Sequence, residues 1–127
     1  MKLSEYFEKT KGRGVLATAD SEGKVNAAIY ARPHFRGEDT IAFIMADRLT
    51  HKNLQSNPHA AYLFMESGEK FVGKRFYLTK IKEEENSELI DTLRRKRYEK
   101  SRSETNYLVY FRIEKVLPLI GKSEQVV

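Results

Sequence analysis

The feature that most constrains this fold is a series of short, β-rich apolar segments separated by polar turns. The predicted strands cover residues 15–19, 25–35, 40–45, 60–65, 74–81 and 107–113. Gly-containing turns at 21–24 and 36–39 favour hairpins between successive strands. Because strands dominate and neighbours in sequence pair, we expect a mainly β fold, a six-stranded antiparallel split β-barrel, rather than a parallel α/β sheet. Pro33 predicts that pairing stops or bulges near the end of the second strand.

Capping residues and apolar stripes predict two or three short helices beside these strands. They cover residues 4–11, 50–57 and 87–100. Ser4 and Thr50 are residue types that cap helices, and Asn57-Pro58 ends the second helix. Acidic residues gather at the start of the third helix and basic residues at its end, which suits the helix dipole.

Length and composition indicate one globular domain, residues 1–127. There is no apolar run long enough to span a membrane and no secretory leader, so we expect a cytoplasmic protein without a membrane partner. The chain has no cysteine, which excludes disulfides, thiol redox chemistry and cysteine-ligated metals. Redox chemistry would therefore require a cofactor. The net charge of +5 favours an anionic partner without identifying it.

Several motifs that suggest other functions have simpler interpretations. Gly68–Lys74 has the spacing of a phosphate-binding P-loop, but Arg75 stands where Ser or Thr is needed, and a predicted strand follows. Basic residues 94–102 could contact nucleic acid phosphates. They fall in the last turns of a predicted helix, where cations are favoured anyway, so we expect no nucleic acid partner. The three histidines lack the spacing of a helical metal site, and we expect no metal.

Residues 47–58 carry the most informative cluster of polar side chains. Thr50 offers a hydroxyl, His51 a ring donor and Lys52 an ammonium group, at the start of a short helix with free amides. Together these groups could hold a phosphate monoester. A polar, capped helix with solvated side chains fits the same residues.

Two stretches of the sequence resemble the pyridoxamine 5'-phosphate oxidase-like family of FMN-binding split barrels. Residues 14–18, 21–23 and 26–28 are similar to the first hairpin of the family. Residues 53–61, with Asn53-Leu54 and Asn57-Pro58, are similar to its helix and fourth strand. The resemblance covers residues 12 to 82. It implies an FMN cofactor and a homodimer with sites at the subunit interface.

The resemblance also implies which residues contact FMN. Arg32 corresponds to the arginine that holds the FMN phosphate, and Leu49-Thr50 stands where the family has an Arg-Lys pair. Thr50, His51 and Lys52 are then expected to supply those phosphate contacts. The backbone from Phe43 to Met45 is expected to border the flavin ring. The full set of predicted cofactor ligands is Arg32, Pro33, His34, Phe43, Ile44, Met45, Leu49, Thr50, His51, Lys52 and Arg75.

The function that this resemblance implies is a flavin-dependent oxidoreductase acting on a small molecule, with hydride transfer to or from the flavin. Arg75 would stabilise the reduced, anionic flavin, and no residue needs to act as a nucleophile. Oxidation of pyridoxamine phosphate is not expected, because the chain ends soon after its sixth predicted strand. The alternatives are a non-catalytic FMN-binding or electron-carrying module, and a flavin-free barrel that binds another anionic ligand.

Overall fold

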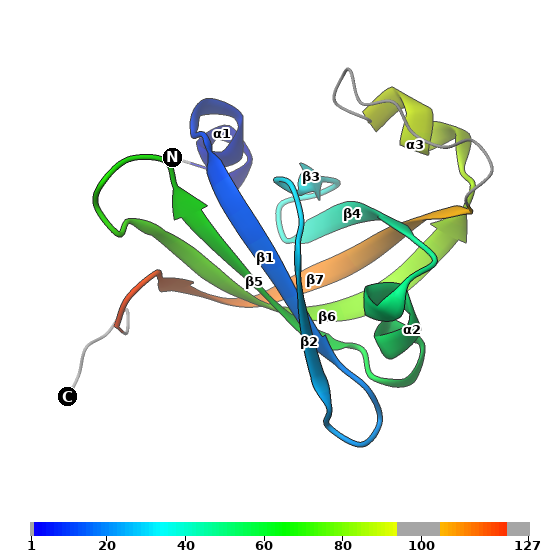
Figure 1. Ribbon diagram of the computed structural model, residues 1–127. Helices are drawn as coiled ribbons and strands as arrows, with labels where there is room; N and C mark the ends of the chain where they lie inside the picture. Colours follow the sequence, from blue (N-terminus) through cyan, green and yellow to red (C-terminus); the bar gives the residue numbers. More distant parts are fainter. Residues whose placement is uncertain (1, 94–104, 122–127) are drawn as a thin grey trace.

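The computed structural model describes residues 2–93 and 105–121, in which seven strands form one antiparallel sheet (Figure 1). The strands are β1 (Gly12–Ala19), β2 (Val25–Ile29), β3 (His34–Phe35), β4 (Thr40–Ala46), β5 (His59–Glu66), β6 (Gly73–Glu85) and β7 (Asn106–Pro118). The helices are α1 (Leu3–Lys9), α2 (Leu49–Ser56) and α3 (Glu88–Leu93). None of these helices is long and apolar enough to cross a membrane.

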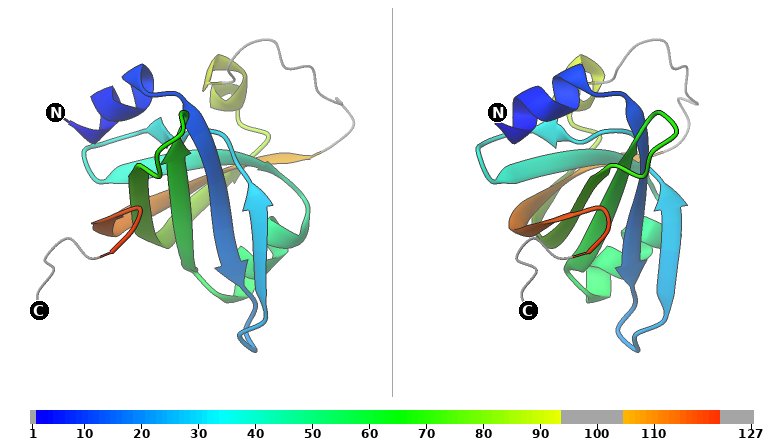
Figure 2. Two further views of the ribbon diagram at one scale, coloured as in Figure 1. Left: turned by 60° about the vertical axis from the view of Figure 1, so that its left-hand side comes forward. Right: turned by 90° about the vertical axis from the view of Figure 1, so that its left-hand side faces the viewer.

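The sheet curls around a core without closing into a continuous barrel. Its strand order is β2-β1-β5-β6-β7-β4-β3, so β2 and β3 form its two ends. The long β6–β7 pair has register shifts after Tyr77 and Lys80, and such irregularities bend a sheet. Figure 2 shows the resulting curvature, with α1 and α2 at opposite ends of the molecule. Helix α2 contacts β1, β2 and β4, and therefore lies against both β2 and β4.

Alternation of apolar side chains along the strands builds the core. Leu16, Tyr62, Phe64, Phe76 and Phe111 are all fully buried and face the inside of the curled sheet. Aromatic rings pack there edge to face or tilted, an arrangement that stabilises aromatic pairs beyond the area they bury. A smaller cluster under α3 contains Ala42, Ile90, Leu108 and Tyr110. This burial holds β4 and its neighbours rigidly in place.

The outer surface of β1, β2, β5 and β6 is unusually apolar. Val25 is 81% exposed and Ile29 74%, while Leu63 and Tyr77 are also exposed. Val15 lies opposite both Ile29 and Leu63 across the sheet, so these side chains share one face. We call this surface the outer apolar face.

The predicted strand at 25–35 was partly wrong, because it is two strands interrupted at residues 30–33. The hydroxyl of Tyr62 donates to the carbonyl oxygens of Tyr30 and Ala31, at 3.1 and 3.0 Å. A side chain therefore satisfies the backbone there, and Pro33 has no N–H to offer a ladder. This interruption confirms the expected end of pairing near Pro33 and raises the number of strands from six to seven.

The other predicted elements are present with shifted boundaries. Strands β6 and β7 each extend several residues beyond the predicted ranges, because the two pair along almost their whole length. Lys2 rather than Ser4 is the N-cap residue of α1, and it makes no side-chain capping bond. Residues 94–100 of the third predicted helix, and the basic run at 94–102, lie outside the described residues.

Candidate functional site

The structure divides the predicted cofactor ligands among four places. Arg32 and Pro33 lie on the connection into β3 and His34 begins β3, while Phe43, Ile44 and Met45 lie within β4. Residues 49–52 form the first turn of α2. The residues at β3 and the first turn of α2 lie at opposite ends of one edge of β4. Arg75 lies elsewhere, in β6.

The backbone of β4 has an open edge over residues 43–46. On one side β7 pairs with β4 along its whole length, from Thr40 to Ala46. On the other side β3 pairs only with Ile41 and Ala42. Within the described residues, the stretch 43–46 therefore has a strand partner on one side only. We call it the β4 open edge; it spans about 13 Å at 3.3 Å per residue.

The β4 open edge lies between β3 and the first turn of α2. His34 and Phe35 lie at one end, where β3 stops pairing, and the first turn of α2 lies at the other. The side chains of Phe43 and Met45 point into the core and are nearly fully buried. A ligand at this edge would thus meet β4 mainly through its backbone N–H and C=O groups.

The first turn of α2 presents backbone amides together with positive charge. Arg48 is its N-cap residue and makes no side-chain capping bond. The amides of residues 49–51 have no carbonyl within the helix to bond, because the first helical bond runs from the Lys52 amide to the Arg48 carbonyl, at 2.9 Å. Arg48 and Lys52 are both exposed. Such a turn attracts anions.

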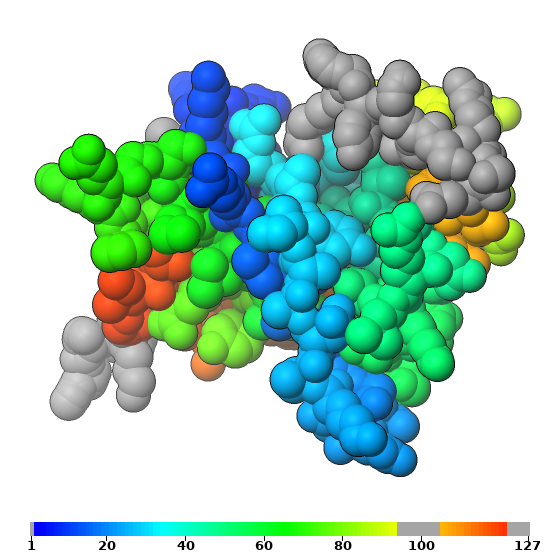
Figure 3. All heavy atoms as spheres, viewed as in Figure 1, coloured from blue at the N-terminus to red at the C-terminus, as the bar shows by residue number. Residues whose placement is uncertain are grey.

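Thr50 is buried and contacts the end of β2. Its Oγ1 accepts a hydrogen bond of 3.4 Å from Asn26 Nδ2, and it also hydrogen-bonds the hydroxyl of Tyr30. Burial raises the pKa of Tyr30, while the bond with Thr50 and the charge of Arg48 reduce that rise. The Tyr30 ring packs edge to face against Phe43, with 5.7 Å between centroids. Figure 3 shows the surfaces of β2 and α2 side by side on this face.

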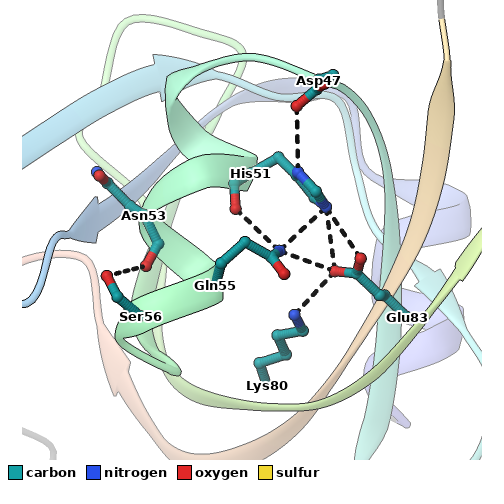
Figure 4. A network of polar contacts seen from close by, with 7 residues as sticks. All are labelled: Asp47, His51, Asn53, Gln55, Ser56, Lys80 and Glu83. Atoms are coloured by element: carbon teal, nitrogen blue, oxygen red, sulfur yellow. Dashed lines mark hydrogen bonds and ion pairs between the residues drawn. The ribbon is translucent and has the colours of Figure 1, made fainter.

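His51 faces away from this turn, into a polar network (Figure 4). Its Nε2 lies 3.1 Å from both carboxylate oxygens of Glu83 in β6, and its Nδ1 lies 3.5 Å from Asp47. Lys80 donates to Glu83 at 2.8 Å, and Gln55 donates to Glu83 at 3.0 Å. The His51 ring stacks on Tyr107, with 3.7 Å between centroids. We call Asp47, His51, Gln55, Lys80 and Glu83 the His51 clamp, which joins α2 to β6.

The clamp strongly favours the charged form of Glu83. Burial opposes ionisation of this carboxyl, but hydrogen bonds from Lys80, Gln55 and His51 outweigh it and lower the pKa to about 2. His51 is only 6% exposed. The predicted role of His51 as a phosphate ligand stays untested, and the contacts described here are with carboxylates.

Arg32 connects the start of β3 to α1. Its Nη1 donates to the carbonyl oxygens of Phe7, at 2.7 Å, and Thr10, at 3.4 Å. Arg32 also lines an open pocket of about 940 Å³. The pocket lining is Lys2, Leu3, Ser4, Phe7, Glu8, Arg32, Pro33, His34, Phe35, Gly37, Glu38 and Leu93. Three predicted ligands thus share this cavity, which adjoins the β3 end of the β4 open edge.

Arg75 is remote from α2 within this chain. Its guanidinium donates to the carbonyl oxygens of Pro118, at 2.8 Å, and Gly121. It precedes Glu83, which contacts α2, by eight residues along β6, or about 26 Å of extended strand. A role for Arg75 beside the same ligand would require a second copy of the chain.

Sequence reasoning missed Asn26, Tyr30 and Arg48. Asn26 and Tyr30 contact Thr50, and Arg48 begins α2. Arg48 lies inside the polar stretch already singled out, so its charge was a usable signal. The roles of Asn26 and Tyr30 depend on contacts between β2 and α2, which are about 20 residues apart in sequence. In the described part of the chain, no group of three or more His, Cys, Asp or Glu side chains could hold a metal ion.

Known structures share this architecture. No protein-family model matches the sequence, and no curated protein matches it significantly. An FMN-binding protein from Syntrophomonas wolfei subsp. wolfei has a TM-score of 0.76 at 21% identity, covering 94% of this chain and 84% of that protein. The fold is that of the FMN-binding split barrels. Candidate pyridoxamine 5'-phosphate oxidases from Lactobacillus delbrueckii and Listeria innocua have the same fold.

Other split barrels of this fold carry different names. HupZ from Group A Streptococcus has a TM-score of 0.68 at 16% identity, covering 94% of this chain and 92% of HupZ. An F420 reductase has a TM-score of 0.65 at 15% identity, covering 88% of this chain and 94% of that protein. At these identities the likeness establishes the fold and confirms the predicted split barrel.

Proposed function

We propose that this chain is an FMN-binding flavoprotein whose cofactor lies along the β4 open edge. The observation that carries this proposal is the continuity of that edge with the first turn of α2, in a fold shared with an FMN-binding protein. An unpaired stretch of backbone beside an anion-attracting turn suits a ligand with a planar polar ring at one end and a phosphate at the other.

The first turn of α2 supplies hydrogen-bond donors and positive charge for a phosphate. The amides of residues 49–51 are hydrogen-bond donors, and Arg48 and Lys52 add positive charge nearby. Charge-assisted bonds of this kind are roughly twice as strong as neutral ones. Arg32 stays a predicted phosphate ligand, although its Nη1 is engaged with α1.

The β4 open edge supplies backbone hydrogen-bonding groups for the flavin ring. Backbone N–H and C=O groups can bond the polar edge of an isoalloxazine, and the Tyr30 ring flanks the same region. When bound, the flavin supplies the hydride chemistry. The protein then orients the ring, limits its contact with water and admits a small-molecule substrate. We therefore infer a flavin-dependent oxidoreductase.

One observation favours the alternative of a flavin-free barrel that binds another anion. The Thr50 hydroxyl is already bonded by Asn26 and Tyr30, and the residue is only 4% exposed. A phosphate would then depend on the amides, Arg48 and Lys52, without the hydroxyl. This arrangement predicts weaker affinity for FMN than a fully open turn would give.

We also propose that the protein is a homodimer joined through the outer apolar face. Val25 and Ile29 are exposed on the outer face of the sheet, next to small residues such as Ala17 and Ala27 that pair across β1 and β2. A contiguous apolar sheet surface of this kind commonly marks an interface. A two-fold axis would bury the outer apolar face on both copies, and the second copy would supply a second Arg75.

The first test is an absorbance spectrum of the purified protein, followed by titration with FMN. We expect saturable binding, weakened by Arg48→Ala and by Lys52→Ala. Lys70→Ala, in the exposed loop before β6, serves as the matched control. Absence of binding to FMN would refute the proposal. Preferential binding of a deazaflavin would show that the cofactor is a deazaflavin and not FMN. Turnover with a reduced nicotinamide then separates an enzyme from an electron carrier.

A further inference from the structure

The hydrogen bonds around His51 account for both of its ring nitrogens. The two Gln55 amide hydrogens have acceptors in Glu83 Oε1, at 3.0 Å, and the His51 carbonyl, at 3.1 Å. His51 Nε2 lies 3.1 Å from both Glu83 oxygens and 3.0 Å from Gln55 Nε2, and Nδ1 faces the carboxylate of Asp47 at 3.5 Å. The two ring nitrogens of His51 thus face two different carboxylates.

This arrangement directs Asp47 towards the His51 ring and not towards the amides of the first turn of α2. A carboxylate near the start of a helix is attracted to those free amides. Asp47 immediately precedes the N-cap residue Arg48, yet α2 has no side-chain cap. The Asp47 carboxylate lies instead 3.5 Å from His51 Nδ1, one turn along α2. A carboxylate on those amides would compete with a phosphate for the same donors.

We propose that His51 is a positioning residue, which restrains Asp47 and so keeps the first-turn amides of α2 available to an anion. This inference rests on the proposed function, because it concerns the same turn. The rest of the clamp fixes the ring: Glu83 bonds His51 Nε2, Lys80 bonds Glu83, and Tyr107 stacks on the imidazole. His51 acts through Asp47 and need not touch the ligand.

The test combines His51→Phe with Asp47→Ala. Phenylalanine keeps a ring on Tyr107 but cannot donate to Asp47. We expect His51→Phe to weaken FMN binding about two- to fivefold, the range that a competing exposed charge at a helix N-terminus produces. Asp47→Ala alone should leave the affinity unchanged or slightly tighter. The double variant should regain the affinity of Asp47→Ala, because the competing carboxylate is gone.

A purely structural role for His51 predicts a different result. Damage to α2 would weaken binding equally in His51→Phe and in the double variant, and that outcome would overturn the proposal. Unchanged affinity in His51→Phe would also overturn it.

A second readout does not need FMN. In His51→Phe, the amide resonances of residues 49–51 should move and gain protection from hydrogen exchange as Asp47 caps the helix, and Asp47→Ala should reverse both changes. If the wild-type protein binds no FMN, the proposed function fails on its own. Unmoved amide resonances would refute the role of His51 independently.

Discussion

Replacing Glu83 by Gln should destabilise the fold in a strongly pH-dependent way. The pKa of Glu83 falls from its usual 4.5 to about 2 in the folded state, because bonds from Lys80, Gln55 and His51 outweigh burial. At 1.36 kcal/mol per pKa unit, this difference corresponds to about 3 kcal/mol of stability at neutral pH. The Glu83 side chain is 23% exposed, so solvent screening reduces the expected value to about 2 kcal/mol.

The sign of the pH dependence follows from the lowered pKa. A carboxyl that ionises more readily when folded contributes its full stabilisation above pH 4.5. That contribution falls as the pH drops from 4.5 towards 2, where the folded-state carboxyl takes up its proton. The difference between wild type and Glu83→Gln should therefore be largest at pH 7 and about half as large near pH 3.

Urea denaturation at several pH values, followed by far-UV circular dichroism, measures this difference directly. Glu69→Gln, in the exposed loop before β6, is the matched control and should change the free energy of unfolding very little at any pH. A loss for Glu83→Gln that stays constant from pH 7 to pH 3 would refute the electrostatic reasoning. It would show that amide packing, and not charge, is responsible.

Three further substitutions test other parts of the structure. Gly14→Ala would place a methyl group against the buried Tyr62 hydroxyl and should cost about 1–3 kcal/mol in urea denaturation. Gly37→Ala, with its nearest neighbour at 3.5 Å, should be neutral, and equal effects would contradict this packing. Arg32→Ala should lower FMN affinity about 10- to 100-fold in a fluorescence titration if its guanidinium binds the phosphate. Unchanged affinity would leave it only the role of holding α1. Ile29→Lys should halve the mass measured by sedimentation if the outer apolar face joins two copies, and a retained dimer would exclude this face.

Local signals in the sequence were sufficient for most secondary structure. Turn residues and β-rich runs predicted the hairpins, and Asn57-Pro58 marked the end of α2. Pro33 signalled the interruption between β2 and β3. The lengths of β6 and β7 were underestimated, because residues 82–85 of β6 and residues 114–115 of β7 are charged and carry little apolar signal.

The candidate site was predictable only in part. The polar stretch from Asp47 to Lys52 pointed to α2, and the β4 backbone follows from the resemblance to split barrels. No local pattern indicated that Thr50 would bond Asn26 and Tyr30, or that His51 would face Glu83. These contacts join segments between 20 and 32 residues apart, and their geometry depends on how far the sheet curls.

The sequence by itself determined which segments become strands, where they turn, and that any redox chemistry needs a cofactor. Periodicity, turn residues and the absence of cysteine act locally and are readable in one dimension. Only the tertiary structure decided that β3 stops pairing after two residues and leaves the β4 edge open beside α2. The physical reason is that strand pairing and side-chain direction are set by the packing of the whole curved sheet, because every buried backbone and polar group must find its partner there.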